Sequence, residues 1–293
     1  MKALKGTGVA MVTPFLKNGD VDYKGLARLV KHLSDGMVEY LVVMGTTAES
    51  ATLSASEQLE VLEFVQKNNK KSLPIVLGMG GNNTAALLEK LKNSDLSKVD
   101  ALLSASPHYN KPSQEGIYQH YKALAEATDK PIILYNVPGR TASNITAATT
   151  LRLANDFSNI IGIKEASADM DQVMEIIEKK PESFLVISGE DGLTFPIITC
   201  GGDGVISVVA NAYPQKFSDM VRATVKGDLE KGRKLHYQLK SFTDLLFAEG
   251  NPAGVKAALA HLEICENNLR LPLWKVSDQL NAEIKLKIES IGN

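Results

Sequence analysis

The sequence predicts a (β/α)8 barrel over residues 1–225, followed by a C-terminal helical appendage over residues 226–293. Eight short apolar runs recur along the chain, and stretches with one apolar helical face lie between them. This alternation repeats at roughly 20 to 35 residues, which fits βαβ units of about thirty residues. Within each run the apolar residues are continuous rather than alternating, as is typical of parallel strands covered on both faces.

The predicted strands follow one another in order, each before a predicted helix. The stretch from Ser54 illustrates these helices: Ser54 and Glu57 predict a capping box, and Leu59, Leu62 and Val65 predict the buried face. After residue 214 only helical patterns follow, which predicts a barrel-completing helix and then the appendage. An open doubly wound sheet is the alternative fold, but its glycine fingerprint is missing after the first run. The eight runs lie at 8–15, 40–45, 74–80, 101–107, 131–138, 160–167, 184–191 and 204–211.

Composition limits the classes of function. Thirty-two basic and 34 acidic residues leave a net charge of −2, which argues against nucleic acid or an anionic membrane as a partner. No segment is long and apolar enough to span a bilayer or to form a signal peptide. Cys200 and Cys265 show no CxxC spacing, and the five histidines show no metal-ligand pattern. We therefore expect a cytoplasmic protein without a metal.

In barrels of this class, function lies at the carboxyl ends of the strands. Hydroxyl groups dominate the polar residues at these ends. The candidates are Thr13, Gly45, Thr46, Thr47, Glu49, Tyr109, Asn110, Tyr135, Asn136, Arg140, Lys164, Gly189, Glu190, Asp191 and Ser207.

Lys164 is the most informative of these residues, because a charge ends an otherwise apolar strand in NIIGIKEAS. A lysine at such a place ordinarily extends to water. If it points into the barrel, however, poor hydration disfavours the ammonium form, and a neutral amine can form a Schiff base with a carbonyl substrate. Glu165 should then point outward and serve as a structural carboxylate.

Tyr135 and Arg140 follow the neighbouring strand. The phenol of Tyr135 predicts a proton donor in the same cavity, although a barrel tyrosine can equally be part of the core. The guanidinium of Arg140 offers a planar fork for a substrate carboxylate, although a loop arginine is more often solvated.

Six blocks in order resemble the pyruvate-dependent class I aldolase superfamily of N-acetylneuraminate lyase. Within it, the chain is similar to the dihydrodipicolinate synthase (4-hydroxy-tetrahydrodipicolinate synthase) family over nearly its whole length. The resemblance implies an imine between Lys164 and pyruvate, whose enamine attacks L-aspartate 4-semialdehyde in the diaminopimelate route to lysine. The blocks are GTTAESATL (45–53), PHYNKPSQEG (107–116), YNVPGRT (135–141), GIKEAS (162–167), SGED (188–191) and GVISVVAN (204–211).

The same resemblance implies roles for single residues. Tyr135 would donate protons in a relay with Thr47 and with Tyr109, which would reach a neighbouring subunit in a homotetramer of tight dimers. Thr46 and Thr47 would hold the pyruvate carboxylate, and Arg140 the semialdehyde carboxylate. The main chain at Gly189 and Ile206 would line the pocket, and no cofactor is implied beyond the imine on Lys164.

This chain departs from the family pattern at two places. Ala48 replaces a glycine, which a turn tolerates if the φ angle is negative. At the pocket that binds lysine in inhibited relatives, Ser50, Ala51 and Asn82 match, but the positions where those relatives carry histidines, a glutamate and a tyrosine are occupied here by Ala55, Gln58, Ala86 and His108. We expect weak or absent inhibition by lysine.

Three other functions compete with this interpretation. Another pyruvate lyase, for N-acetylneuraminate or a keto-sugar acid, is the alternative, but such lyases typically lack the loop arginine. A catalytically silent binding barrel would not need the imine residues. A phosphate-binding isomerase would need a glycine-rich loop after one of the last two strands, and neither has one.

Overall fold

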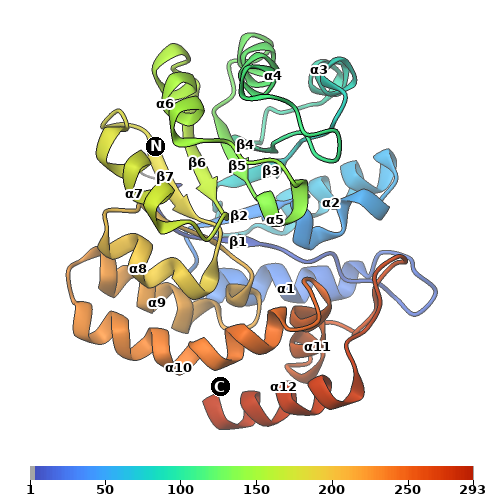
Figure 1. The fold of residues 1–293 in the computed structure, drawn as a ribbon. Helices are drawn as coiled ribbons and strands as arrows, with labels where there is room; N and C mark the ends of the chain where they lie inside the picture. The colour runs from blue at the N-terminus through green and yellow to red at the C-terminus, as the bar shows by residue number, and fades with distance from the viewer. Residues whose placement is uncertain (1–3, 293) are drawn as a thin grey trace.

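The computed structural model describes residues 4–292, and within this range eight parallel strands close into a single barrel in chain order (Figure 1). The predicted (β/α)8 fold is confirmed. The strands are shorter than the apolar runs, because the buried loops that follow the strands are also apolar. Their bounds are β1 Gly6–Ala10, β2 Tyr40–Val43, β3 Ile75–Gly78, β4 Ala101–Ala105, β5 Ile132–Asn136, β6 Ile160–Glu165, β7 Leu185–Ser188 and β8 Gly204–Ser207.

Each strand is followed by a helix that covers the outside of the barrel. The capping box of Ser54 and Glu57 begins α2, as predicted. The predicted buried face of that helix is partly wrong: Leu62 and Val65 are buried, but Leu59 is 50% exposed and Val61 is buried instead. The covering helices are α1 Tyr23–Asp35, α2 Ala55–Asn68, α3 Thr84–Asn93, α4 Gln114–Glu126, α6 Ala147–Asp156, α7 Met170–Lys179, α8 Thr194–Thr199 and α9 Pro214–Val225.

The apolar side chains form two separate cores. One core lies between the sheet and the helices and contains residues such as Leu134, Ile163 and Val186. The other fills the inside of the barrel and includes Tyr135 and Ile187. Because successive side chains of a strand point to opposite faces, this division fixes which residues enter the barrel.

The barrel closes at a seam between β1 and β8, where the backbones approach closely. Gly6 pairs with Gly204 across this seam. A Cβ atom at Gly204 would lie 2.1 Å from the carbonyl oxygen of Gly6, so a side chain there would hold the two strands apart.

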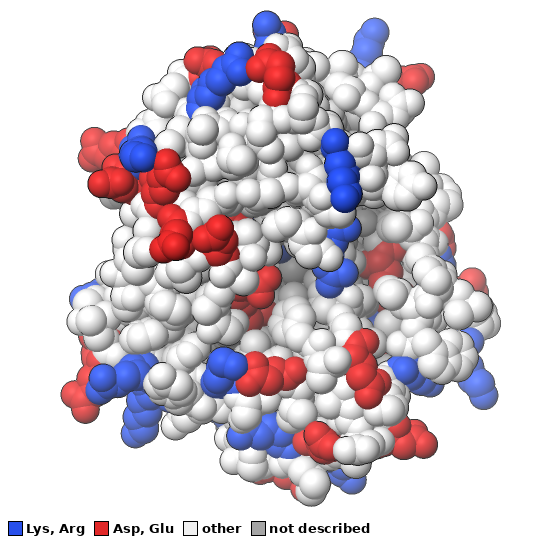
Figure 2. Space-filling model, viewed as in Figure 1, with Lys and Arg blue, Asp and Glu red and all other residues white. Residues whose placement is uncertain are grey.

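Three further helices follow the barrel and pack along one side of it, as Figure 1 shows: α10 Leu229–Phe247, α11 Ala253–His261 and α12 Asp278–Ile291. The long α10 packs on α9, and α12 packs on α10 and α11. Shorter helical turns lie in the loops after the strands: η2 Thr46–Ala48, η3 Ser50–Thr52, α5 Pro138–Thr141, η4 Asp191–Leu193 and η5 Val209–Asn211. In the view of Figure 2, basic and acidic side chains are interspersed and the face is hollowed near its centre.

Candidate active site

Lys164 and Tyr135 lie side by side inside the barrel. The two residues pair across β5 and β6, and Lys164 pairs on its other side with Ile187 of the inner core. Only 6% of Lys164 is exposed, and its Nζ lies 4.2 Å from the centroid of the Tyr135 ring. The amine is therefore shielded from bulk water and next to the phenol ring, as the sequence-based interpretation requires.

The residues that follow β6 and β7 pack closely around the Lys164 side chain. A Cβ atom at Gly189 would lie 3.1 Å from Cε of Lys164 and 2.6 Å from Cβ of Ala166, so a larger residue would press on the lysine. Ile206 is 1% exposed and belongs to the inner core. Gly189 and Ile206 thus lie at the carboxyl end of the barrel, in the region of the predicted pocket.

Two carboxyl groups after β7 lie within electrostatic reach of Lys164. Burial raises the pKa of Asp191, and hydrogen bonds from Ser207 and from the backbone of Val208 and Val209 oppose this rise, with a smaller contribution from the charge of Lys164. Burial, and then the charge of Asp191, raises the pKa of Glu190, while Lys164 and Arg140 lower it. Oδ2 of Asp191 accepts hydrogen bonds from the backbone N–H groups of Val208, at 2.9 Å, and Val209, at 3.2 Å. Asp191 therefore holds the loop after β8 against the loop after β7.

Glu165 points away from the barrel interior, as predicted. It is 1% exposed, and its carboxylate accepts hydrogen bonds from Nδ2 of Asn136, Nε2 of Gln172 and the backbone of Ser167. Burial raises the pKa of Glu165, and these donors oppose the rise. The structural role expected for this carboxylate is confirmed by its contacts, which join β5, β6 and α7.

The Thr46–Glu49 turn follows β2 and presents two hydroxyl groups. Thr47 is 3% exposed, and its Oγ1 accepts a hydrogen bond of 2.9 Å from Nδ2 of Asn251. Thr46 is exposed. Ala48 is not among the residues with positive φ; instead Glu49, one residue later, has a φ of 54°. The glycine usual in the family is therefore not needed for the backbone at Ala48.

Arg140 and Tyr109 lie on the loops after β5 and β4. Arg140 is exposed, and its Nη2 donates a 3.3 Å hydrogen bond to the carbonyl oxygen of Asn251. Tyr109 is 83% exposed and has a φ of 68°, and its backbone N–H donates to the carbonyl oxygen of Thr141. The structure does not bury Tyr109 beside Lys164 within one chain.

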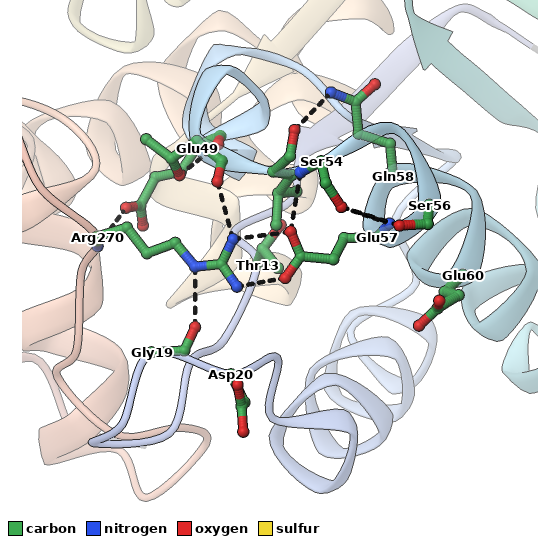
Figure 3. Close-up of polar contacts among 12 residues, drawn as sticks. Thr13, Gly19, Asp20, Glu49, Ser54, Ser56, Glu57, Gln58, Glu60 and Arg270 are labelled. Atoms are coloured by element: carbon green, nitrogen blue, oxygen red, sulfur yellow. Dashed lines mark hydrogen bonds and ion pairs between the residues drawn. The ribbon is translucent and has the colours of Figure 1, made fainter.

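The sequence-based prediction missed a group of residues from the C-terminal segment that reaches this site. Lys256 of α11 forms an ion pair with Glu49, and neither side chain is exposed. The backbone N–H of Arg270 donates to Oε2 of Glu49 at 3.0 Å, and its guanidinium pairs with Glu57 (Figure 3). A lysine within the apolar stretch GVKAALA was the one available signal, since a charge in such a helix needs a buried partner.

Neither a membrane span nor a cluster of metal ligands is found among residues 4–292. No helix in this range is both long and apolar enough to cross a membrane. In the same range, no three or more His, Cys, Asp or Glu side chains are grouped as a metal site.

Comparisons with known proteins agree with this geometry. The family model described as "Dihydrodipicolinate synthetase family" matches residues 3–291. A 4-hydroxy-tetrahydrodipicolinate synthase of Flavobacterium psychrophilum is 54% identical over 286 residues, which cover 98% of each chain.

Solved structures match as closely in fold. A dihydrodipicolinate synthase from Acinetobacter baumannii, solved in complex with pyruvate, has a TM-score of 0.95 at 37% identity, covering 98% of this chain and 99% of that one. A dihydrodipicolinate synthase from Cyanidioschyzon merolae, solved with lysine bound, has a TM-score of 0.94 at 34% identity, covering 99% and 98%. The match across the whole barrel, together with a buried lysine beside a tyrosine, establishes that this chain belongs to the dihydrodipicolinate synthetase family.

Proposed function

We propose that this chain joins pyruvate to L-aspartate 4-semialdehyde through an imine on Lys164, the reaction of 4-hydroxy-tetrahydrodipicolinate synthases in the diaminopimelate route to lysine. One observation carries the proposal: the Lys164 amine is buried inside the barrel, 4.2 Å from the centroid of the Tyr135 ring. The shared name of the curated relatives supports this lyase activity over that of an N-acetylneuraminate or keto-sugar-acid lyase.

The chemistry proceeds in balanced steps. After losing its proton, the amine of Lys164 attacks the C2 carbonyl of pyruvate, and loss of water from the carbinolamine leaves an imine. Loss of a C3 proton then forms the enamine, whose C3 bonds to the aldehyde carbon of the semialdehyde. Finally the amino group of the condensed substrate displaces Lys164 from the imine carbon, which closes the ring and frees the enzyme.

Each remaining residue has a task in these steps. Tyr135 gives a proton to the leaving hydroxyl of the carbinolamine, and Thr47 passes protons along the relay. Thr46 and Thr47 hold the pyruvate carboxylate, while Arg140 holds the carboxylate of the semialdehyde. The backbone at Gly189 and Ile206 lines the pocket. No cofactor is needed, because the imine on Lys164 supplies the electron sink.

The relay is completed by a second chain. Tyr109 is 83% exposed and is held in a left-handed backbone conformation on a loop after β4, so it is free to enter a neighbouring site. We place it in the partner's relay, in a homotetramer made of tight dimers. The two unpaired cysteines, Cys200 and Cys265, fit a cytoplasmic enzyme.

The test is intact-mass measurement after borohydride reduction with pyruvate. We expect one pyruvate adduct on the wild-type chain, mapped to the peptide that contains Lys164, and no adduct on Lys164→Ala. Lys180→Ala is the matched control and keeps the adduct, because Lys180 precedes β7 and pairs with Asp203 at the opposite end of the barrel. A wild-type chain without an adduct would exclude the imine. Assays of condensation with L-aspartate 4-semialdehyde and of cleavage of N-acetylneuraminate or a keto-sugar acid then distinguish this function from that of a sugar-acid lyase.

A further inference from the structure

Asn251 connects two loops of the active site, although it lies outside the barrel. It precedes α11 and is 8% exposed. Its side-chain Nδ2 donates to Oγ1 of Thr47 at 2.9 Å, and its carbonyl oxygen accepts from Nη2 of Arg140 at 3.3 Å. One residue of the C-terminal segment thus contacts both the loop after β2 and the loop after β5.

The segment that carries Asn251 is fixed to the Thr46–Glu49 turn at two more points. The first is the wholly buried ion pair of Lys256 and Glu49. The second is Arg270, which donates to Glu49 through its backbone and to the carbonyl oxygen of Thr52 through Nη1, at 2.8 Å. Figure 3 shows the Arg270 guanidinium between Glu57 and Gly19, with Glu49 beside it. Three contacts on one turn leave little freedom for the position of Thr47.

The chemistry of this hydrogen bond decides where the Thr47 proton goes. A threonine hydroxyl has one proton to donate and two lone pairs to accept with. The amide nitrogen of Asn251 only donates, so the contact uses a lone pair of Thr47 and leaves its proton available. Within residues 4–292, no protein acceptor takes this proton, so it can be given to a substrate or to the relay.

We propose that Asn251 is a positioning residue that sets the direction of the Thr47 hydroxyl, so that Thr47 donates its proton into the active site. The inference rests on the proposed role of Thr47 in proton transfer. Asn251 does not touch the reacting atoms and acts through Thr47.

Two substitutions of one side chain test the direction of the bond. In Asn251→Ala the donor is lost and the hydroxyl turns freely, so we expect kcat to fall about 10-fold, the equivalent of one hydrogen bond. In Asn251→Asp an isosteric carboxylate accepts the Thr47 proton and withdraws it from the site. We expect a loss of about 100-fold or more, as when a catalytic donor is removed.

Both variants keep the backbone carbonyl that accepts from Arg140. A disturbance of Arg140 would therefore appear as a raised KM for the semialdehyde, whereas misdirection of Thr47 lowers kcat. The melting temperature of each variant separates a loss of folding, which follows if the buried bond to Thr47 is structural, from a loss of catalysis. Equal kcat values for the Ala and Asp variants would overturn the inference.

A double-mutant cycle with Thr47→Val gives a second test that does not depend on the Asp variant. If Asn251 acts through Thr47, Asn251→Ala has no further effect on kcat in the Thr47→Val background. An unchanged 10-fold loss in that background would place the role of Asn251 elsewhere. If Thr47→Val alone keeps the wild-type kcat, the proposed role of Thr47 fails, and the position of Asn251 has no catalytic consequence.

Discussion

Glu49 and Lys256 form an ion pair in which neither side chain has any exposed surface. The ammonium of Lys256 also donates to the carbonyl oxygen of Asn268 at 2.8 Å and lies 4.1 Å from the centroid of the Phe15 ring. Burial lowers the pKa of Lys256, while Glu49 opposes this change. Such a pair costs free energy to desolvate, but removing one partner costs more, because the other charge stays buried alone.

The first prediction follows from this asymmetry. Lys256→Met should lower the free energy of unfolding by about 3–5 kcal/mol, measured by urea denaturation. Glu49→Gln combined with Lys256→Met should regain much of this loss, since no charge remains in the apolar environment. If the double variant is no more stable than the single one, the loss comes from packing and not from an isolated carboxylate.

Tyr135 offers a test of proton transfer. Tyr135→Phe keeps the ring that packs against Lys164 but removes the hydroxyl, so kcat should fall by about 10²–10⁴ while the fold is retained. The steady-state rate and the melting temperature are the two measurements. Tyr118→Phe on α4 is the matched control, because it removes a phenol bonded to Asp156 outside the barrel. A full rate in Tyr135→Phe would assign the proton to another group.

Glu57 gives the stability of the protein a defined pH dependence. Hydrogen bonding to Arg270 is the largest cause that lowers the pKa of Glu57 from 4.5 to about 2. A carboxyl whose pKa is lower in the folded state stabilises the fold above the unfolded pKa, and this contribution is lost as the pH falls from 4.5 toward 2. The wild type should therefore melt at a higher temperature than Glu57→Gln at neutral pH, and the difference should vanish near pH 2.

The glutamine keeps one acceptor oxygen for the capping box but has an amide nitrogen in place of the other oxygen, so the charge of residue 57 and one hydrogen bond from Arg270 are removed together. Glu63→Gln is the control on the same helix, where the side chain is exposed. A melting difference that persists unchanged in acid would show that charge at residue 57 is not the cause.

We expect lysine to inhibit this enzyme weakly or not at all. Gln58 takes one of the diagnostic positions, and its Nε2 donates to the carbonyl oxygens of Ser50 and Leu53 while its Oε1 accepts from Lys90. With Ala86 in place of a glutamate, a bound lysine ammonium loses a contribution of about 1.5–3 kcal/mol. Half inhibition at submillimolar lysine in a rate titration would contradict this expectation, and Ala86→Glu should increase sensitivity.

The barrel and the position of Lys164 were predictable from the sequence because both depend on local patterns. Continuous apolar runs identify strands buried on both faces, and the alternation of side chains then places Lys164 inside and Glu165 outside. Strand ends were less predictable, because the residues of η5 are as apolar as the strand before them. Leu59 was misassigned, because its helix also presents Val61, Leu62 and Val65 to the core.

The contacts of Asn251, Lys256 and Arg270 could not be predicted in the same way. They join residues about 200 positions apart, such as Asn251 and Thr47. No periodic pattern encodes which surface of the barrel the C-terminal helices cover, so their partners are visible only in three dimensions. The contacts of Tyr109 are equally hard to predict from sequence patterns, because its proposed partner is a second chain.

The placement of Asn251, Lys256 and Arg270 after the eighth strand also concerns the order of biosynthesis. All eight strands leave the ribosome before these three residues do, so the contacts that hold the turn at Thr47 can be completed only when the last part of the chain is present.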